Sequence, residues 1–156
     1  MNENLLMNQF EFARMIILNV GNEVTEEIAD IIPKGFPNSL RWQLGHVYVT
    51  VEEILFYFAN EKMNLPADYS ELFSRGTKPS SWSSEPPAIE ELFTLLKEQQ
   101  SRVKETFSNR MDEKLSQTFE AGPLKLETIG EVLLFALFHE SEHIGCIKSL
   151  KNAVKA

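Results

Sequence analysis

Apolar residues recur every three or four positions along most of the chain, which is the spacing of one face of a helix. The pattern predicts four long helices, over about residues 4–32, 40–61 and 88–110 and from about residue 128 onward. Gly21 either kinks the first helix or weakens its middle. Asn38 or Ser39 can cap the second helix. Thr128 and Glu131, three residues apart, form a capping box that begins the fourth.

Two segments interrupt the helical pattern. Residues 63–87 are rich in proline, glycine and serine, so we expect a long connection between the second and third helices. Its aromatic side chains, among them Tyr69 and Trp82, indicate that the connection packs on the body of the protein. Residues 115–127 contain a Gly-Pro turn signal and fit either a short hairpin or irregular chain.

These elements predict an all-α four-helix bundle with a long crossover loop between helices 2 and 3. The length of 156 residues fits a single domain over residues 1–156. A net charge of -8 disfavours nucleic acid and anionic membranes as partners. The chain shows no signal-peptide pattern and has one cysteine, Cys146, which together predict a cytoplasmic protein.

Two of the three histidines are four residues apart in the last predicted helix. This spacing puts His139 and His143 on one face, where two imidazoles can reach a single divalent metal. The plainer alternative is a pair of core histidines that hydrogen-bond to neighbouring side chains. His46, in the second predicted helix, can complete a three-histidine set if the two helices are neighbours. Three protein ligands and an open position are typical of a catalytic metal site.

A competing motif overlaps the same histidines. Residues 139–143 read H-E-S-E-H, a literal match to the H-E-x-x-H pattern of metalloproteases, in which Glu140 would be the general base. The residues after His143 include no Asp, Glu or His to serve as the downstream third ligand. No predicted strand directly precedes the helix to hold a peptide substrate, so we disfavour a protease.

The sequence resembles the DinB/YfiT-like superfamily along essentially its whole length. The resemblance rests on Trp42-Gln43-Leu44-Gly45-His46 in the second helix and on Thr128 and residues 139–145 of the last, together with Phe73-x-x-Gly76 in the long connection. It implies an up-down-down-up four-helix bundle and, frequently, a homodimer formed through helix faces. It also implies a divalent metal, often nickel or zinc, held by three histidines. By matching position, these ligands are His46, His139 and His143.

The resemblance implies no single reaction, because fold does not fix function. Some members transfer bacillithiol, mycothiol or glutathione to an electrophile, and others isomerise maleylpyruvate with such a thiol. We therefore expect a metal-dependent thiol S-transferase of the bacillithiol type, or a hydrolase, acting on a small electrophilic molecule. A low-molecular-weight thiol or a water would lose its proton at the metal. Tyr69 and Trp82 could wall the mouth of the cavity.

Several polar residues are secondary candidates. Thr50 and Glu53 lie one and two turns beyond His46 and could orient a ligand or a bound water, although a solvated or core-edge position is the plainer alternative. Glu142 serves either surface solvation or such a supporting role. Cys146 could be a fourth ligand or a redox-sensitive thiol, but a small buried core residue is the favoured interpretation.

Two alternatives to an enzyme stay open at this point. One is a non-enzymatic, stress-related bundle in which the metal is only a structural pin. The other is an interaction bundle without a metal. The sequence does not choose among the metals, the thiols or the substrates.

Overall fold

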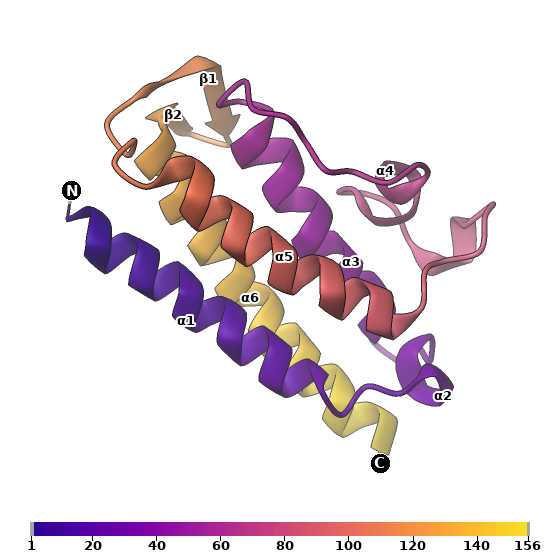
Figure 1. Cartoon of the computed structure of the whole chain (residues 1–156). Coiled ribbons are helices and arrows are strands. Elements are labelled where there is room, and N and C mark those ends of the chain that lie inside the picture. Colours follow the sequence, from indigo (N-terminus) through magenta and orange to yellow (C-terminus); the bar gives the residue numbers. More distant parts are fainter. Residues whose placement is uncertain (1, 156) are drawn as a thin grey trace.

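The computed structural model describes residues 2–155, and four long helices dominate it. In chain order the elements are α1 (Glu3–Gly21), α2 (Glu26–Ala29), α3 (Leu40–Val51), the π-helical turn η1 (Glu52–Phe56), α4 (Tyr69–Phe73), the 3-10 turn η2 (Pro79–Ser81), α5 (Ile89–Phe107), β1 (Lys114–Ala121), β2 (Leu124–Thr128) and α6 (Ile129–Lys155). Helices α1, α3, α5 and α6 pack on one another as a bundle, with the two chain ends at opposite ends of it (Figure 1). The expected helical bundle is therefore confirmed.

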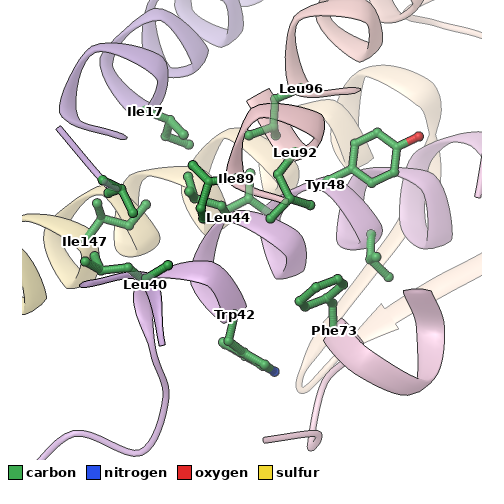
Figure 2. Close-up of a cluster of buried hydrophobic side chains, with 14 of the residues drawn as sticks. Ile17, Leu40, Trp42, Leu44, Tyr48, Phe73, Ile89, Leu92, Leu96 and Ile147 are labelled. Carbon is green, nitrogen blue, oxygen red and sulfur yellow. The ribbon is translucent and has the colours of Figure 1, made fainter. Parts of the chain in front are cut away.

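The core lies between the four long helices. Figure 2 shows fully buried apolar side chains from all four, including Ile17 of α1, Leu44 of α3, Leu92 of α5 and Ile147 of α6. A second cluster, which includes Phe10, Phe56, Phe107 and Leu133, continues the core toward the hairpin of β1 and β2. Burial of side chains of this size stabilises the fold by roughly 1.5–3 kcal/mol each.

The first two helices end earlier than their apolar patterns predict. Helix α1 ends at Gly21, where the Val24 N–H donates to the Gly21 carbonyl and the chain turns toward the short α2. A Cβ on Gly21 would lie 2.7 Å from the ring of Phe93 on α5, so glycine permits this close approach. Helix α3 is α-helical only to Val51 and continues as the π-helical turn η1. The Ser39 side chain caps α3, as one of the two expected alternatives.

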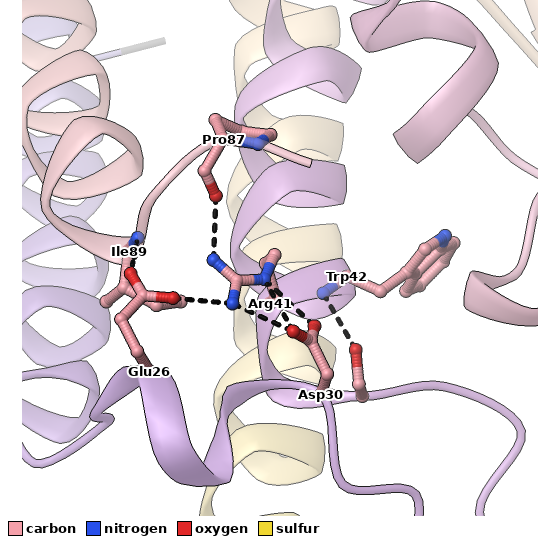
Figure 3. Close-up of polar contacts among 7 residues, drawn as sticks. Glu26, Asp30, Arg41, Trp42, Pro87 and Ile89 are labelled. Carbon is pink, nitrogen blue, oxygen red and sulfur yellow. Dashed lines mark hydrogen bonds and ion pairs between the residues drawn. The ribbon is translucent and has the colours of Figure 1, made fainter. Parts of the chain in front are cut away.

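A buried arginine fixes the start of α3 to its neighbours. The Arg41 guanidinium pairs with Glu26 of α2 and with Asp30, and it donates to the Pro87 carbonyl ahead of α5 (Figure 3). Glu26 also accepts a hydrogen bond from the Ile89 N–H, the first of helix α5. These bonds hold α2 and the beginnings of α3 and α5 together, at the end of the bundle away from the hairpin.

The start of α6 matches its sequence pattern, but its burial does not. Thr128 Oγ1 accepts from the Glu131 N–H at 3.3 Å and the Glu131 carboxylate accepts from the Thr128 N–H at 2.9 Å, which is the expected capping box. Before it, residues 115–127 form the antiparallel hairpin. Apolar residues surround the first half of this helix in the sequence, which favours a place in the core, yet Leu134 is 47% exposed and Phe138 is 57% exposed. Helix α6 packs mainly on α1 and α3, and these two side chains contact solvent.

No helix within residues 2–155 is both long enough and apolar enough to cross a bilayer.

Candidate metal centre

Helices α3 and α6 bring the three histidines together. His46 Nε2 and His143 Nε2 each lie 3.1 Å from His139 Nε2. One ring nitrogen of each histidine can be chosen so that all three lie within 4.8 Å of one another. Because His46 is 93 positions from His139, only the packing of α3 on α6 creates this cluster.

Hydrogen bonds on the far sides of two rings orient these nitrogens. His46 Nδ1 lies 2.6 Å from the Phe73 carbonyl oxygen, and His143 Nδ1 contacts Gln43 Oε1. Both oxygens only accept, so each Nδ1 carries the proton and each Nε2 presents a lone pair to the cluster. Among residues 2–155, the buried Nδ1 of His139 has no hydrogen-bond partner.

The spacing of the nitrogens fits one divalent ion. Two imidazole nitrogens bound about 2.0–2.1 Å from the same metal lie about 2.8–3.4 Å apart for bond angles between roughly 90° and 110°. The two separations of 3.1 Å fall in this interval. Neutral imidazoles suit zinc, nickel, copper and iron, so the donor set does not distinguish zinc from nickel.

The imidazoles are neutral at ordinary pH. Burial, with a smaller contribution from the adjacent His46, lowers the pKa of His139 to about 4. Burial lowers the pKa of His143 to about 3, again with help from the two neighbouring rings. Burial also lowers the pKa of His46, against the opposing effect of the Phe73 carbonyl. All three rings can therefore bind a cation at pH 7 without first releasing a proton.

The Trp-x-x-Gly-His stretch of α3 builds one wall of this centre. The Trp42 ring stacks on the His46 ring, with centroids 4.4 Å apart and planes inclined by 11°. A Cβ on Gly45 would lie 2.4 Å from the ring of Phe73, so only glycine lets Phe73 of α4 pack against this turn. Figure 2 shows Trp42 and Phe73 within the buried cluster of apolar side chains. The close packing of Phe73 brings its carbonyl to His46.

A pocket of about 440 Å³ borders the three imidazoles. Its lining includes Thr50, Glu53 and Glu142, all three of which were candidates on sequence grounds. It also includes residues that the sequence pattern does not reveal, namely Ile54, Arg75, Phe119, Glu120, Ala121 and Phe135. Three of these come from strand β1, whose position over the bundle depends on long-range packing and leaves no local signal.

The structure places Tyr69 and Trp82 elsewhere, which corrects the expectation that they wall the cavity mouth. Neither belongs to the pocket lining. The Tyr69 hydroxyl donates to Glu91 on α5, and Trp82 Nε1 donates to the Leu72 carbonyl. The Trp82 ring also packs edge-on against Phe73. Tyr69 thus attaches the long connection to α5, whereas Trp82 holds the later part of the connection to α4.

Two further expectations change. Cys146 is exposed, so it is not a small buried core residue, and the histidine cluster found within residues 2–155 does not include it. Glu140 is fully buried and its carboxylate pairs with Arg14, so it cannot serve as the general base of the H-E-x-x-H reading. The third partner of the helix α6 histidines comes from upstream, on α3, and not from the tail.

The profile of the DinB superfamily matches residues 9–147, a range that includes all three histidines. The chain belongs to the DinB superfamily. A comparison with curated proteins finds no match. Superfamily membership and the cluster together support a metal-binding DinB-like protein.

Proposed function

We propose that this DinB-like protein is an enzyme that binds zinc or nickel through His46, His139 and His143. Its reaction is transfer of a low-molecular-weight thiol, of the bacillithiol type, to a small electrophile, or hydrolysis of such a molecule. One observation carries the proposal: the three Nε2 atoms converge beside a pocket instead of being enclosed. Exposed Arg75 and Glu142 are part of the lining, so small molecules can enter from solvent.

A divalent ion bound there would supply Lewis acidity that favours the anion of a thiol or a water at neutral pH. The protein residues around it have separate tasks. The Thr50 hydroxyl lies 3.4 Å from His46 Nε2 and can form a hydrogen bond with a thiol or a water bound in the pocket. Glu142 lines the same pocket and can accept the proton that the thiol or water releases.

Apolar side chains limit the water in the pocket. Phe119 of β1 and Phe135 of α6 pack against each other with ring centroids 5.5 Å apart, and both line the pocket together with Ile54. Such a wall suits the carbon skeleton of a small electrophile. A drier site also strengthens the interaction between a nucleophilic anion and its surroundings.

We also propose the up-down-down-up order of helices for this bundle. In Figure 1 the connection from η1 to α5 returns along the length of the bundle, as a crossover between two parallel helices requires. A homodimer and a cytoplasmic location stay predictions.

Metal content tests the first half of the proposal. We expect the purified protein to hold about one divalent ion per chain, measured by elemental analysis after dialysis. His46→Ala should lose most of this metal, because a ligand is removed, and its affinity should fall by more than the 10–100-fold typical of losing a supporting residue. Glu142→Gln, which lines the pocket outside the cluster, is the matched control and should retain the ion. A wild-type protein without stoichiometric metal would contradict every metal-dependent function.

Activity tests the second half. The metal-loaded protein is mixed with a panel of thiols and the electrophile monochlorobimane, and conjugation is followed by fluorescence. We expect acceleration with at least one thiol and its loss after chelation of the metal. A panel of esters and amides tests hydrolysis in the same way. A metal-loaded protein that is no faster than buffer in both panels would leave the metal as a structural pin.

A further inference from the structure

Several hydrogen bonds hold the segment that follows α4 in place. Trp82 Nε1 donates to the Leu72 carbonyl at 2.8 Å and Trp42 Nε1 donates to Thr77 Oγ1 at 2.9 Å. Thr77 Oγ1 in turn donates toward the Leu72 and Ser74 carbonyls. The segment from Leu72 to Thr77 is therefore rigidly held at both of its ends.

Two further bonds join this segment to pocket residues. The Phe73 carbonyl accepts from His46 Nδ1 at 2.6 Å, and the Ser74 hydroxyl donates to Glu53 at 2.6 Å. Between these anchors and Thr77, the chain reverses in a turn closed by the Thr77 N–H and the Ser74 carbonyl. Gly76 has a φ of +91°, which glycine adopts without strain in such a turn. The turn presents Arg75 to the pocket.

Arg75 differs from the other arginines of the chain. Arg14, Arg41, Arg102 and Arg110 each pair with a carboxylate. Within residues 2–155, Arg75 makes no ion pair and no side-chain hydrogen bond, although three glutamates share its pocket. The backbone of Arg75 is held in place and the N–H donors of its guanidinium have no partner in that range, so the guanidinium can bind an acceptor group of a ligand.

Within residues 2–155, none of the three pocket glutamates forms an ion pair with Arg75. Glu53 accepts from the Ser70 and Ser74 hydroxyls, and Glu120 pairs with Lys125 on the hairpin. Glu142 lines the pocket from α6. Arg75 is thus the one cationic side chain among the residues that line the pocket, and its free fork of N–H donors matches an oxyanion.

We infer that Arg75 is a specificity residue that binds an oxyanion, such as a carboxylate or a sulfonate, on a small ligand whose other end reaches the three histidines. The inference rests on the proposed function and adds the charge of the ligand to it. The guanidinium selects ligands that carry an acid group at a distance from their metal-binding atom. The guanidinium also orients these ligands, because one end of the ligand is then held by Arg75 and the other end at the three histidines.

Thiols that differ in the charge of their second group test this directly. The probes are 3-mercaptopropionate and 6-mercaptohexanoate as carboxylates with short and long spacers, 2-mercaptoethanesulfonate as a tetrahedral oxyanion, 2-mercaptoethanol as a neutral thiol and cysteamine as a cation. Binding to the Co²⁺-loaded protein is followed by the thiolate-to-metal absorption band. The variants are Arg75→Gln and, as control, Lys78→Gln, which removes an exposed charge three residues further along the chain and outside the pocket.

For the wild type we expect at least one acid thiol to bind about five- to tenfold more tightly than 2-mercaptoethanol, a factor in the range of an accessible charge-assisted contact. Arg75→Gln should remove this preference and leave the dissociation constant of 2-mercaptoethanol unchanged. Lys78→Gln should keep the preference, since it changes the net charge equally. Comparing each thiol between wild type and variant cancels differences in thiol acidity. The carboxylate and sulfonate arms show which oxyanion fits.

Other results overturn the inference. An unchanged preference in Arg75→Gln, an equal loss in Lys78→Gln, or tightest wild-type binding of cysteamine each contradicts a direct contact. If the protein binds Co²⁺ and thiols without any charge preference, the proposed function survives and the role of Arg75 does not. If it binds no metal, both fail together. If it binds Co²⁺ but shows no thiolate band with any probe, the inference and the thiol-transfer arm of the proposed function fail, and only the hydrolysis arm is left.

Discussion

At the scale of single residues, the protonation of the imidazoles follows from their crowding. His139 and His143 have pKa values of about 4 and about 3 in the folded protein, because burial and the neighbouring rings disfavour their charged forms. In the unfolded chain both return to about 6.5. Below that pH the unfolded chain takes up protons that the folded protein does not, so the free energy of unfolding of the metal-free protein should fall as the pH drops from about 6.5 toward 4. Urea denaturation at pH 7, 6 and 5, with a chelator present, measures it.

The double variant His139→Gln with His143→Gln is the control for this pH dependence. It lacks both of these histidines, so its stability should change much less between pH 7 and pH 5. An equal slope in the wild type and the double variant would contradict the low pKa values of these histidines.

The residue scale also shows which parts of the site sequence reasoning can reach. The pairing of His139 with His143 is predictable, because residues four apart share a helix face whatever the rest of the fold does. Arg75 is not predictable in this way, since its place depends on a turn that Trp82 anchors and that Trp42 anchors from 35 positions before Thr77. Aromatic composition pointed to Trp82 as a pocket residue, whereas its indole is used to hold that turn.

At the scale of elements, the contact between α3 and α4 depends on the absence of a side chain. Gly45→Ala would place a Cβ 2.4 Å from the Phe73 ring, so the ring must move. We expect a loss of about 1–3 kcal/mol of stability, as for other overpacked cores. Because Phe73 also supplies the carbonyl that orients His46, metal affinity should fall as well. Urea denaturation and competition with a chelating dye measure the two effects.

Gly145→Ala is the matched control for that substitution. Gly145 also lies in a long helix, but a Cβ there meets nothing within 4 Å. The substitution should leave metal affinity unchanged and stabilise helix α6 by up to about 1 kcal/mol, since alanine is the better helix former. If Gly45→Ala proved as harmless as Gly145→Ala, the close packing of Phe73 on α3 would be wrong.

The limits of the elements were predictable where local chemistry sets them. The capping box of Thr128 and Glu131 begins α6 as expected, because its bonds join residues three apart. The end of α1 at Gly21 was not predictable, since apolar residues continue at helical spacing beyond it. There the chain turns because α5 lies against it, which is a tertiary effect. The same holds for the π-helical turn after Val51.

At the scale of the whole molecule, one buried polar network connects the four long helices. Arg14 of α1 pairs with Glu140 of α6 and donates to the Leu96 carbonyl and to Gln99 Oε1 of α5. Gln99 Nε2 in turn donates to the Tyr48 carbonyl of α3. Arg14, Gln99 and Glu140 are all fully buried. These hydrogen bonds fix the register of each helix relative to the others. Because the groups are buried, water cannot replace a partner that is removed.

Removing one partner of this network should therefore cost more than removing the charged pair. Glu140→Ala leaves the Arg14 guanidinium buried without its carboxylate, and we expect a loss of about 3–5 kcal/mol. Arg14→Met combined with Glu140→Leu replaces both charges by apolar groups, and it should be more stable than Glu140→Ala although it changes more atoms. Denaturant unfolding of the three proteins gives the order. If the double variant were the least stable, the ion pair itself and not the avoidance of an unpaired charge would hold the helices. The folded double variant should bind as much metal as the wild type, because Glu140 faces Arg14 and not the imidazoles. A metalloprotease-like role for Glu140 predicts instead that any metal-dependent activity is lost in both variants.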